Sequence, residues 1–402
     1  MRVMNKEFPR SLSVFFSPIG GGGMGVHGRH VLRALTKVGP THCIVPHSIP
    51  LINCHLSSSS VVSNPLLSIW QKISNKVFPQ PGVGVLKGCK NIGKQARLIM
   101  DSGGNFNFIY GFSGVALESF KRAYEWGIPR ILDHPNLHPS KFRNSYLSEH
   151  AKWVGSRPFY GNPTVEMVQR MEEEMELASL IRVNSALAKE SLVENGVDVA
   201  KIKVLHQPLD DDLQFPINKK SGVKGQLRIC FVGSICLRKG FIYLLRAIRS
   251  LRNDKVSVIF VGNTGDRECK KILMRESRGL NIEIKPGNPG PALCQSDLLV
   301  LPSLEDGFGL VVTEAMRAGL PVIVTDMCGA KEIVEEGVNG WIVKEGDVEA
   351  LAERLKWAVD HVDLLPSIGA NARRTSDGLT IDGHDYAFRQ MISGHILEKV
   401  RK

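Results

Sequence analysis

Short apolar runs alternate with longer amphipathic stretches along most of the 402 residues. Such alternation is typical of α/β proteins in which helices cover a parallel sheet. The pattern stops at a polar segment ending in KKSGVKGQ, residues 219–226, and restarts with the apolar run 227–232. A chain of this length exceeds one ordinary hydrophobic core. The sequence therefore predicts two α/β domains whose strand ends face a common cleft.

The same pattern locates the individual elements. Strands are expected at 12–16, 43–45, 108–110, 130–132, 181–183, 202–205, 227–232, 256–261, 297–301, 322–324 and 341–343. Helices are expected at 26–37, 115–126, 164–178, 188–195, 240–252, 348–359 and 385–400. The acid run in 164–178 is interpreted as a solvated helix face. Residues 47–92, rich in Ser, Pro and Gly, are left unassigned.

Residues 301–333 combine a strand, a turn and a helix start, in the order LPSLEDGFGLVVTEAMRAGLPVIVTDMCGAKEI. Asp306 and Glu314 stand eight positions apart, with a Gly-Phe-Gly turn between them. A helix that begins near Gly309 presents free backbone N–H groups beside both acids. N–H groups bind phosphate, and carboxylates bind sugar hydroxyls, so the stretch favours a nucleotide sugar. A general acid/base pair, or acids that only stabilise the helix dipole, are the alternatives.

Two other motifs also follow predicted strands. The run GGGGMG, residues 20–25, allows a close approach of the backbone to a ligand, although a flexible loop would look the same. It is weak as a dinucleotide motif, because no acid ends the second strand. Arg238 and Lys239 precede a predicted helix, where two cations and the N–H groups would hold a diphosphate. A solvated helix start fits that pair equally well.

Histidines and acids elsewhere leave their roles open. His134 and His138 lie in RILDHPNLHPS, at the end of a predicted strand, where they are either cleft residues or structural. Prolines beside them keep the chain extended. The triple Asp at 210–212 suggests a metal site, but near a linker it is better explained as a solvated turn.

The composition indicates a reduced, intracellular protein. None of the eight cysteines forms a CxxC pair, and several stand in apolar runs, which favours buried thiols. No apolar run reaches the roughly 18 residues of a membrane span, and the N-terminus shows no signal-peptide pattern. We therefore expect a cytoplasmic location.

Positive charge is concentrated at the start of the chain. Residues 1–100 contain twelve Lys and Arg residues and one acid, Glu7, so this segment carries a charge equal to the +11 of the whole chain. A basic domain attracts anionic lipid headgroups or an anionic substrate, whereas a generally basic solvated surface has no such partner.

The motifs, taken in order, resemble the family-4 retaining glycosyltransferases of GT-B fold. The matching pieces are GGGGMGVHGRHVLRAL, EEEMELASLIRVNSALAKESLVENGV, KIKVLHQPLD, FVGSICLRKGFIYLLRAI and SLEDGFGLVVTEAMRAGLPVI. The resemblance implies two Rossmann-like domains facing a central cleft and a last helix that crosses back to the first domain. It divides the chain into an acceptor domain (1–213), a linker (214–226), a nucleotide-sugar domain (227–380) and the crossing helix (381–402).

The resemblance also implies roles for particular residues. Those expected to act in catalysis are His134, Lys239 and Asp306. Those expected to bind the donor are Gly22, Gly23, Arg238, Lys239, Asp306, Gly307, Phe308, Gly309, Leu310 and Glu314. Within this set Lys239 matches the lysine on the diphosphate, Glu314 the acid on the ribose, and Asp306 the acid on the sugar.

Two positions depart from the family pattern. Asp306 stands where the first acid is usually Glu, and Ser234 stands where Arg is common. A shorter acid alters the reach to the sugar, and the missing charge would have to come from Arg238. Both departures bear on donor choice and rate.

The implied reaction keeps the sugar's configuration and needs no protein nucleophile. Lys239, Arg238 and helix N–H groups stabilise the leaving diphosphate while the acceptor attacks the same face. No metal and no cofactor is expected. The expected partners are a UDP- or GDP-linked sugar, a glycan, lipid-linked or small-molecule acceptor, and an anionic membrane surface that meets residues 1–100.

Three other functions remain open. A sugar-nucleotide epimerase has the same fold but needs no acceptor. A non-catalytic partner subunit would tolerate the changes at Asp306 and Ser234. A nucleic-acid binder is the least favoured, because the aromatic content of 7% shows no interleaved stacking pattern.

Overall fold

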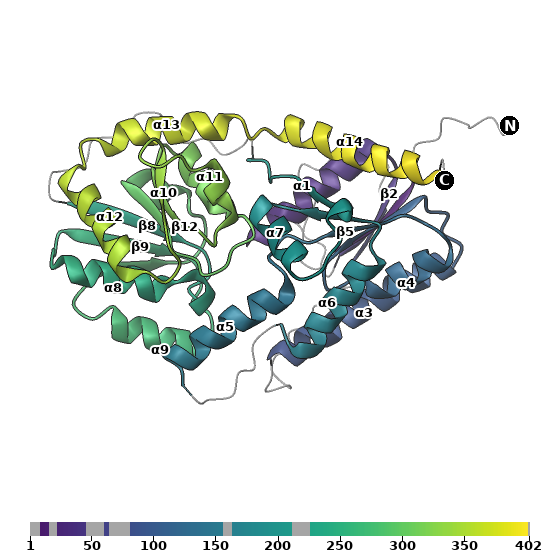
Figure 1. Ribbon diagram of the computed structural model, residues 1–402, viewed down its shortest axis with the longest axis horizontal. Coiled ribbons are helices and arrows are strands. Elements are labelled where there is room, and N and C mark those ends of the chain that lie inside the picture. Colours follow the sequence, from purple (N-terminus) through teal and green to yellow (C-terminus); the bar gives the residue numbers. More distant parts are fainter. Residues whose placement is uncertain are drawn as a thin grey trace.

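The computed structural model describes residues 9–15, 22–45, 60–63, 81–155, 163–210 and 226–400. They form two parallel sheets with helices on both faces, which confirms the predicted α/β class (Figure 1). The sheet of the first domain has the strand order β3-β2-β1-β4-β5-β6-β7, and that of the second has the order β10-β9-β8-β11-β12-β13. Because each sheet is buried on both faces, its central strands are continuous apolar runs such as LLVL in β11.

The first domain contains strands β1 Ser11–Val14, β2 Thr41–Val45, β3 Ser60–Ser63, β4 Phe108–Phe112, β5 Arg130–Asp133, β6 Leu180–Val183 and β7 Ile202–Val204. Its helices are α1 Gly22–Val38, α3 Pro81–Asp101, α4 Leu117–Glu125, α5 Pro139–Trp153, α6 Val165–Leu177, α7 Ala186–Glu194 and the 3-10 helix η1 Val199–Lys201.

The second domain contains strands β8 Leu227–Val232, β9 Val256–Val261, β10 Asn281–Lys285, β11 Leu298–Leu301, β12 Val322–Thr325 and β13 Gly340–Val343. Its helices are η2 Leu237–Lys239, α8 Phe241–Leu251, α9 Arg267–Glu276, α10 Gly290–Gln295, α11 Leu310–Arg317, η3 Gly329–Ile333, α12 Val348–Asp360 and α13 Leu365–Asp377, and α14 Ile381–Val400 follows them.

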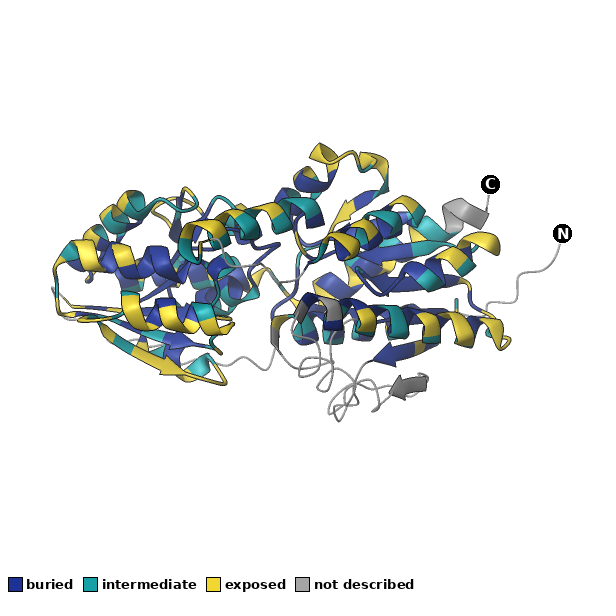
Figure 2. Ribbon diagram, turned by 90° about the horizontal axis from the view of Figure 1, so that it is seen from below, coloured by how far each residue is buried: buried dark blue, intermediate teal, exposed yellow. Residues whose placement is uncertain are grey.

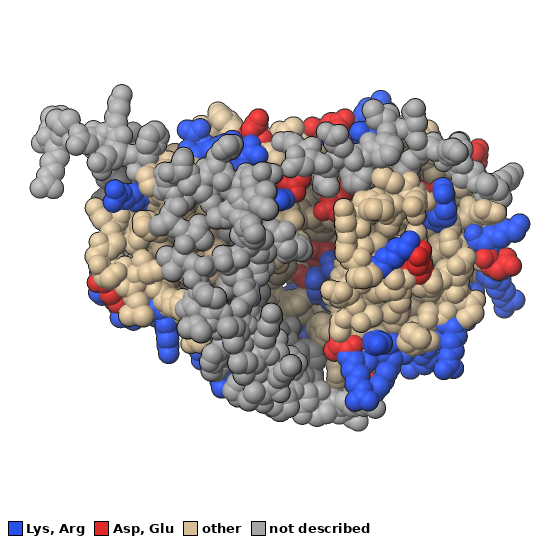
Figure 3. Space-filling view, turned by 180° about the vertical axis from the view of Figure 1, so that it is seen from behind, with Lys and Arg blue, Asp and Glu red and all other residues tan. Residues whose placement is uncertain are grey.

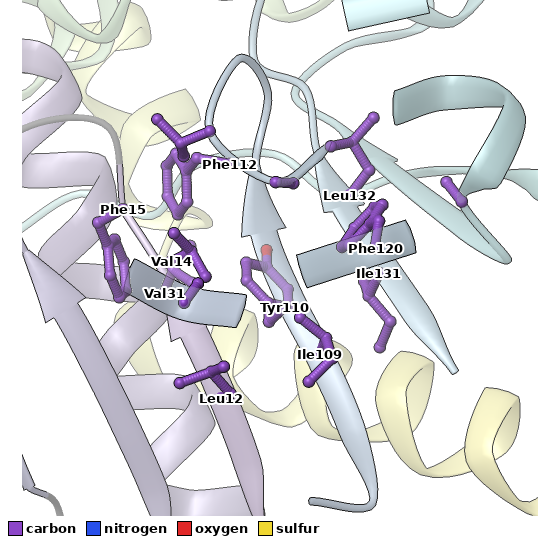
Figure 4. Packing of buried hydrophobic residues seen from close by; sticks show 14 of the residues in the cluster. Leu12, Val14, Phe15, Val31, Ile109, Tyr110, Phe112, Phe120, Ile131 and Leu132 are labelled. Atoms are coloured by element: carbon purple, nitrogen blue, oxygen red, sulfur yellow. The ribbon is translucent and has the colours of Figure 1, made fainter. Parts of the chain in front are cut away.

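Separate apolar cores fill the two domains. In the first, side chains of β1, β4 and β5 pack against α1 and α4, with Phe15, Tyr110, Phe112 and Phe120 among the largest (Figure 4). In the second, one cluster fills each face of the sheet. Helices turn buried faces toward the sheets and exposed faces outward (Figure 2). The clusters place the strand ends of each domain in fixed positions.

The last helix crosses back to the first domain, as the resemblance implied. Helix α14 lies along α1 (Figure 1), and Phe388 and Ile392 belong to the core of the first domain. The Asp385 carboxylate pairs with Lys37 at 2.5 Å and with Arg33 at 3.3 Å. The predicted linker, 214–226, lies almost wholly outside the described residues, so the domain borders stay predictions.

Helix α5 makes a second connection, which the sequence did not predict. It leaves the end of β5 and runs to the second domain (Figure 1), where Tyr146 and Trp153 pack against that domain's core. The Tyr243 hydroxyl of α8 donates a hydrogen bond to Glu149 of α5 at 2.7 Å. A helix that belongs to the first domain in sequence is therefore packed against the second.

The interpretation of the acid run in α6 as a solvated helix face is wrong for Glu174. Glu174 is fully buried, not solvated, and its carboxylate accepts hydrogen bonds from the backbone N–H groups of Gly114, Ala116 and Leu117. These groups lie at the start of α4, where N–H groups have no partner within the helix. Glu174 therefore caps a neighbouring helix, a contact between α6 and α4 that the spacing of acids in α6 does not reveal.

Candidate functional site

The second domain brings Lys239 and Asp306 together. Lys239 ends η2, which follows β8, and Asp306 lies in the turn after β11, the strand next to β8. The Lys239 Nζ donates a hydrogen bond to the Asp306 carboxylate in an ion pair. Adjacent parallel strands end at the same edge of a sheet, so residues 67 positions apart meet here. Two of the three predicted catalytic residues, Lys239 and Asp306, are therefore in direct contact.

Lys239 and Asp306 form a pair of opposite charges. Burial opposes ionisation of Asp306, but the Lys239 and Arg238 charges and hydrogen bonds from Lys239 and the Phe308 N–H hold its pKa below the ordinary value. Lys239 is consequently neutralised by Asp306 in the free protein. A diphosphate that reached Lys239 would compete with this carboxylate.

Helix α11 begins directly after this turn. Gly309 has φ +84°, a left-handed conformation that glycine adopts readily, and it precedes Leu310 at the helix start. Among the described residues, no acceptor binds the backbone N–H groups of Leu310 and Val311. The helix therefore presents free N–H groups and the positive end of its dipole beside Lys239 and Asp306.

Glu314 lies one turn into the same helix. Burial, and then the negative charge of Asp210, raise its pKa to about 7. Its carboxylate has no hydrogen-bond partner within the described part of the chain. Asp210 itself pairs with Arg29 and His30 of α1, so it is not the solvated turn that was predicted. An unpartnered, half-buried acid is suited to accept hydroxyl groups from a ligand.

Arg238 is already engaged. Its guanidinium donates hydrogen bonds to the carbonyl oxygen of Glu305 at 2.8 Å and to the Glu305 carboxylate at 3.2 Å, and it lies over the Phe142 ring at 5.7 Å. Glu305 is buried, and its Oε1 also accepts a hydrogen bond from the Leu137 N–H of the first domain at 3.1 Å. Arg238 is therefore not free to replace the charge that Ser234 lacks.

Glu305 was missed by sequence reasoning. It precedes Asp306, and the motif directs attention to the second acid of the Glu-Asp pair. Only the fold shows that Glu305 points to the first domain while Asp306 faces Lys239. Glu305 thus connects the two domains, and its neighbour Asp306 binds Lys239.

The Gly-Phe-Gly turn also has a structural role. A Cβ atom at Gly307 would lie 1.8 Å from the carbonyl oxygen of Pro135 in the first domain. The Ser185 hydroxyl donates to the Gly307 carbonyl at 2.6 Å. Phe308 is buried and stacks on His206. Glycine at 307 is therefore required by contact between the domains, so close ligand approach is not its only explanation.

His134 and His138 have different surroundings. The His134 Nε2 lies 3.0 Å from the Leu137 carbonyl oxygen, and its Nδ1 is buried without a partner. Burial lowers the pKa of His134 to about 4, so the ring is neutral near pH 7. His138 caps α5 by accepting from the Ser140 N–H at 3.3 Å. The pair therefore contains one candidate cleft residue, His134, and one structural residue.

The glycine run contributes the start of α1. That helix begins at Gly22, not at the predicted residue 26, while 16–21 lie outside the described residues. A side chain at Gly23 would meet nothing within 4 Å, so its surroundings are open. The next turn is tightly held, because His27 Nε2 lies 2.9 Å from Asp133, which also binds Tyr110 and Arg182.

The described cations near the start of the chain are mostly paired. Those with acid partners are Arg29, Arg33, Lys37, Lys90 and Arg97. Lysine and arginine side chains also gather over the second domain on the face shown in Figure 3. The positive excess of residues 1–100 therefore does not appear as one free basic face among the described residues.

No helix in the described ranges is both long and apolar enough to cross a membrane. Within the same ranges, no three His, Cys, Asp or Glu side chains are grouped to hold a metal ion.

Solved structures share this architecture over nearly the whole chain. Sucrose-phosphate synthase from Thermosynechococcus elongatus superposes with a TM-score of 0.71 at 16% identity and covers 96% of this chain and 98% of its own. Anabaena HepE in complex with UDP-glucose gives a TM-score of 0.67 at 17% identity, with 96% and 100% coverage. At such identities the likeness shows the fold.

Sequence relatives match about half of the chain. Capsular polysaccharide biosynthesis glycosyltransferase CapM of Staphylococcus aureus is 24% identical over 205 residues, 48% of this chain and 52% of its own. Amylovoran biosynthesis glycosyltransferase AmsK of Erwinia amylovora is 27% identical over 238 residues, 54% and 55% respectively. The chain spans about half the length of the curated relatives it matches.

The family match covers the domain that holds Lys239, Asp306 and Glu314. Residues 214–375 match the model of glycosyl transferases group 1. Residues 214–375 are therefore similar to the glycosyl transferases group 1 family, and the chain has the GT-B fold.

Proposed function

We propose that the protein is a retaining glycosyltransferase that moves a sugar from a UDP- or GDP-linked donor to a glycan, lipid-linked or small-molecule acceptor. The observation that carries the proposal is the cluster formed by Lys239, Asp306 and the free start of α11, with unpartnered Glu314 one turn away. It combines a cation and N–H groups for a diphosphate with two acids for hydroxyl groups. A nucleotide sugar presents both kinds of group.

In the proposed reaction an acceptor hydroxyl attacks the anomeric carbon as the bond from that carbon to the phosphate oxygen breaks. The bonding electrons leave with the nucleoside diphosphate, and a phosphate oxygen takes the acceptor's proton. Lys239 and the α11 N–H groups stabilise the charge that develops on the diphosphate. Neutral His134, buried at the end of β5 in the first domain, would position a hydroxyl of the sugar.

The relatives support this assignment. HepE was solved with UDP-glucose, and CapM and AmsK are glycosyltransferases of polysaccharide biosynthesis. We therefore place the reaction in the synthesis of a cell-surface polysaccharide or glycoconjugate. The proposed location is the cytoplasm, with the acceptor held mainly by the first domain.

Binding to the inner membrane surface through residues 1–100 is a separate proposal. It predicts that the protein floats with anionic vesicles at low salt and is released at about 0.5 M salt, because surface attraction is screened. Absence from the vesicle fraction at low salt would refute it.

A donor-turnover assay tests the proposed reaction. UDP- and GDP-linked sugars are incubated with the protein and followed by proton NMR, with water as the slow acceptor. We expect one donor to be consumed, its sugar to be released first in the donor's own anomeric form, and the rate to fall at least about a hundredfold in Lys239→Ala. Lys271→Ala, at an exposed lysine of α9, is the matched control.

Other outcomes decide between the remaining functions. An inverted anomer rules out retention. An epimerised nucleotide sugar without acceptor indicates an epimerase. Nucleotide binding with no turnover of any donor, even with acceptor mixtures added, indicates a non-catalytic partner subunit.

A further inference from the structure

A small pocket of about 150 Å³ lies in the first domain between α1, the ends of β4 and β5, α5 and α6. Its walls are largely apolar, formed by side chains that include Met24, Phe112, Leu137, Phe142 and Met171. Phe112 and Leu137 are buried, whereas the other three are half-buried. Among the described residues, these half-buried apolar side chains leave an apolar opening.

The walls of this pocket contact the proposed donor site. The Leu137 N–H donates to Glu305, and the Phe142 ring lies under the Arg238 guanidinium. Pro135, another wall residue, lies against Gly307. A ligand in the pocket would therefore extend toward the place where the acceptor hydroxyl must meet the donor sugar.

Two buried polar atoms of the pocket's lining residues lack hydrogen-bond partners among the described residues. His134 is buried, and neither its Nδ1 nor the Ser113 hydroxyl has a hydrogen-bond partner among the described residues. Buried polar atoms without partners are rare in native proteins, and at a site they indicate a missing ligand or water. A hydroxyl group attached to an apolar ligand would supply such a partner.

The size and chemistry of the pocket restrict its occupant. A dry apolar cavity of about 150 Å³ accommodates benzene. A sugar ring of similar volume would leave most of its hydroxyl groups against apolar walls, at a cost for each unpaired group. No lysine or arginine lines the pocket among the described residues, so it does not suit a phosphate.

We propose that this pocket binds the apolar part of the acceptor, a single ring or a short alkyl chain attached to the group that receives the sugar. The proposal rests on the glycosyltransferase function and adds the acceptor's chemical class: an acceptor with a compact apolar group. Glycosides of an aryl or short alkyl alcohol meet this description, whereas a purely polar glycan does not.

Paired ligands test the proposal. The p-nitrophenyl and methyl glycosides of glucose, galactose, mannose and N-acetylglucosamine are titrated by ligand-observed NMR in the presence of UDP or GDP. For at least one sugar, we expect the aryl glycoside to bind about tenfold or more tightly than the methyl glycoside, because the ring buries apolar surface. Met171→Phe fills the pocket and should bring that ratio close to one.

Control variants make the result specific. Met274→Phe enlarges an exposed side chain of α9 and should leave the ratio unchanged. Met24→Phe fills the pocket from α1 and replaces Met171→Phe if that variant melts early. The proposal fails if no aryl glycoside binds, if aryl and methyl glycosides bind equally, or if the aryl preference survives both filling variants. If UDP or GDP still raises the melting temperature, the donor site is intact, and only the proposal for the pocket has failed.

Discussion

Glu314 and Glu174 are glutamates with the same raised pKa, about 7, and different surroundings. Burial is the main cause in both. Glu174 is surrounded by backbone N–H donors and Arg170, whereas Glu314 lies near the repelling charge of Asp210. The first arrangement satisfies the acid within the protein, and the second leaves it for a ligand.

Nucleotide binding should depend on the ionisation of Glu314. If the ribose hydroxyls donate to this carboxylate, binding favours its ionised form and lowers its pKa, so affinity increases as pH rises through 7. From pH 5.5 to 7.5 we expect up to about a twentyfold gain, measured by calorimetry. Glu314→Gln should lose this component and retain only the titration of the nucleotide itself. An equal pH dependence in both proteins would contradict this role.

Removal of the Glu174 carboxylate should destabilise the first domain. Glu174→Ala leaves three buried N–H groups without their acceptor and removes an ion pair with Arg170, and we expect a loss of about 3 kcal/mol or more at pH 7 in urea unfolding. Glu173→Ala, at the exposed neighbour, should cost less than about 1 kcal/mol. Equal effects would show that Glu174 is not the cap of α4.

The same glutamate gives a pH dependence with a defined sign. Its folded-state pKa, about 7, exceeds the ordinary 4.5, so the folded protein binds the proton more tightly than the unfolded chain. Its contribution to stability therefore decreases as pH rises from about 4.5 to 7. Glu314 adds to this trend.

At the scale of elements, the sequence predicted most strands and failed where neighbours decide the structure. Largely apolar runs identified β8, β9 and β12 because these strands are mostly buried on both faces. Strand β10 is largely exposed and polar, so no run marked it. Helix α5 was missed because its apolar residues pack on the other domain and give no clear stripe.

The same distinction separates the site residues that the sequence predicted from those that it missed. Lys239, Asp306 and Glu314 could be selected from local motifs, because turn and helix start are contiguous in sequence. Glu305, Asp210 and the His27–Asp133 contact depend on partners more than 100 residues away, or in another domain. A single sequence does not show which of its distant residues come into contact.

Gly307→Ala should weaken contact between the domains at the turn after β11. The added methyl group meets backbone atoms of Pro135 and Asn136, which have no room to yield, so the domains must separate. We expect a larger radius of gyration by small-angle scattering and a loss of at least about tenfold in transfer rate. Gly88→Ala, in α3 with nothing within 4 Å, should change neither quantity. An unchanged radius in Gly307→Ala would refute the contact.

For the whole molecule, two crossings connect the domains. Helix α14 returns from the second domain to the core of the first, and α5 extends from the first to the core of the second (Figure 1). Contacts at Glu305 and Gly307 lie between these crossings. The relative position of the two halves of the site is therefore set by packing at several places.

Phe388→Ala should detach α14 from the first domain. Phe388 is fully buried, with its ring 5.6 Å from that of Tyr110, and such truncations cost about 3–5 kcal/mol. We expect a lower melting temperature and faster proteolysis within α14. Tyr386→Ala, at an exposed position of the same helix, should be close to neutral. Similar melting temperatures for both variants would show that the helix does not depend on this core contact.

The most direct test of the donor site is calorimetric titration of UDP and GDP into the wild-type protein, Lys239→Ala and the control Lys271→Ala. The structure predicts that one nucleotide binds the wild type and the control alike, and that Lys239→Ala weakens it by at least about tenfold, because a charged hydrogen bond to the diphosphate is lost. Binding of equal strength to all three proteins, or to none, would contradict a nucleotide-sugar site at Lys239.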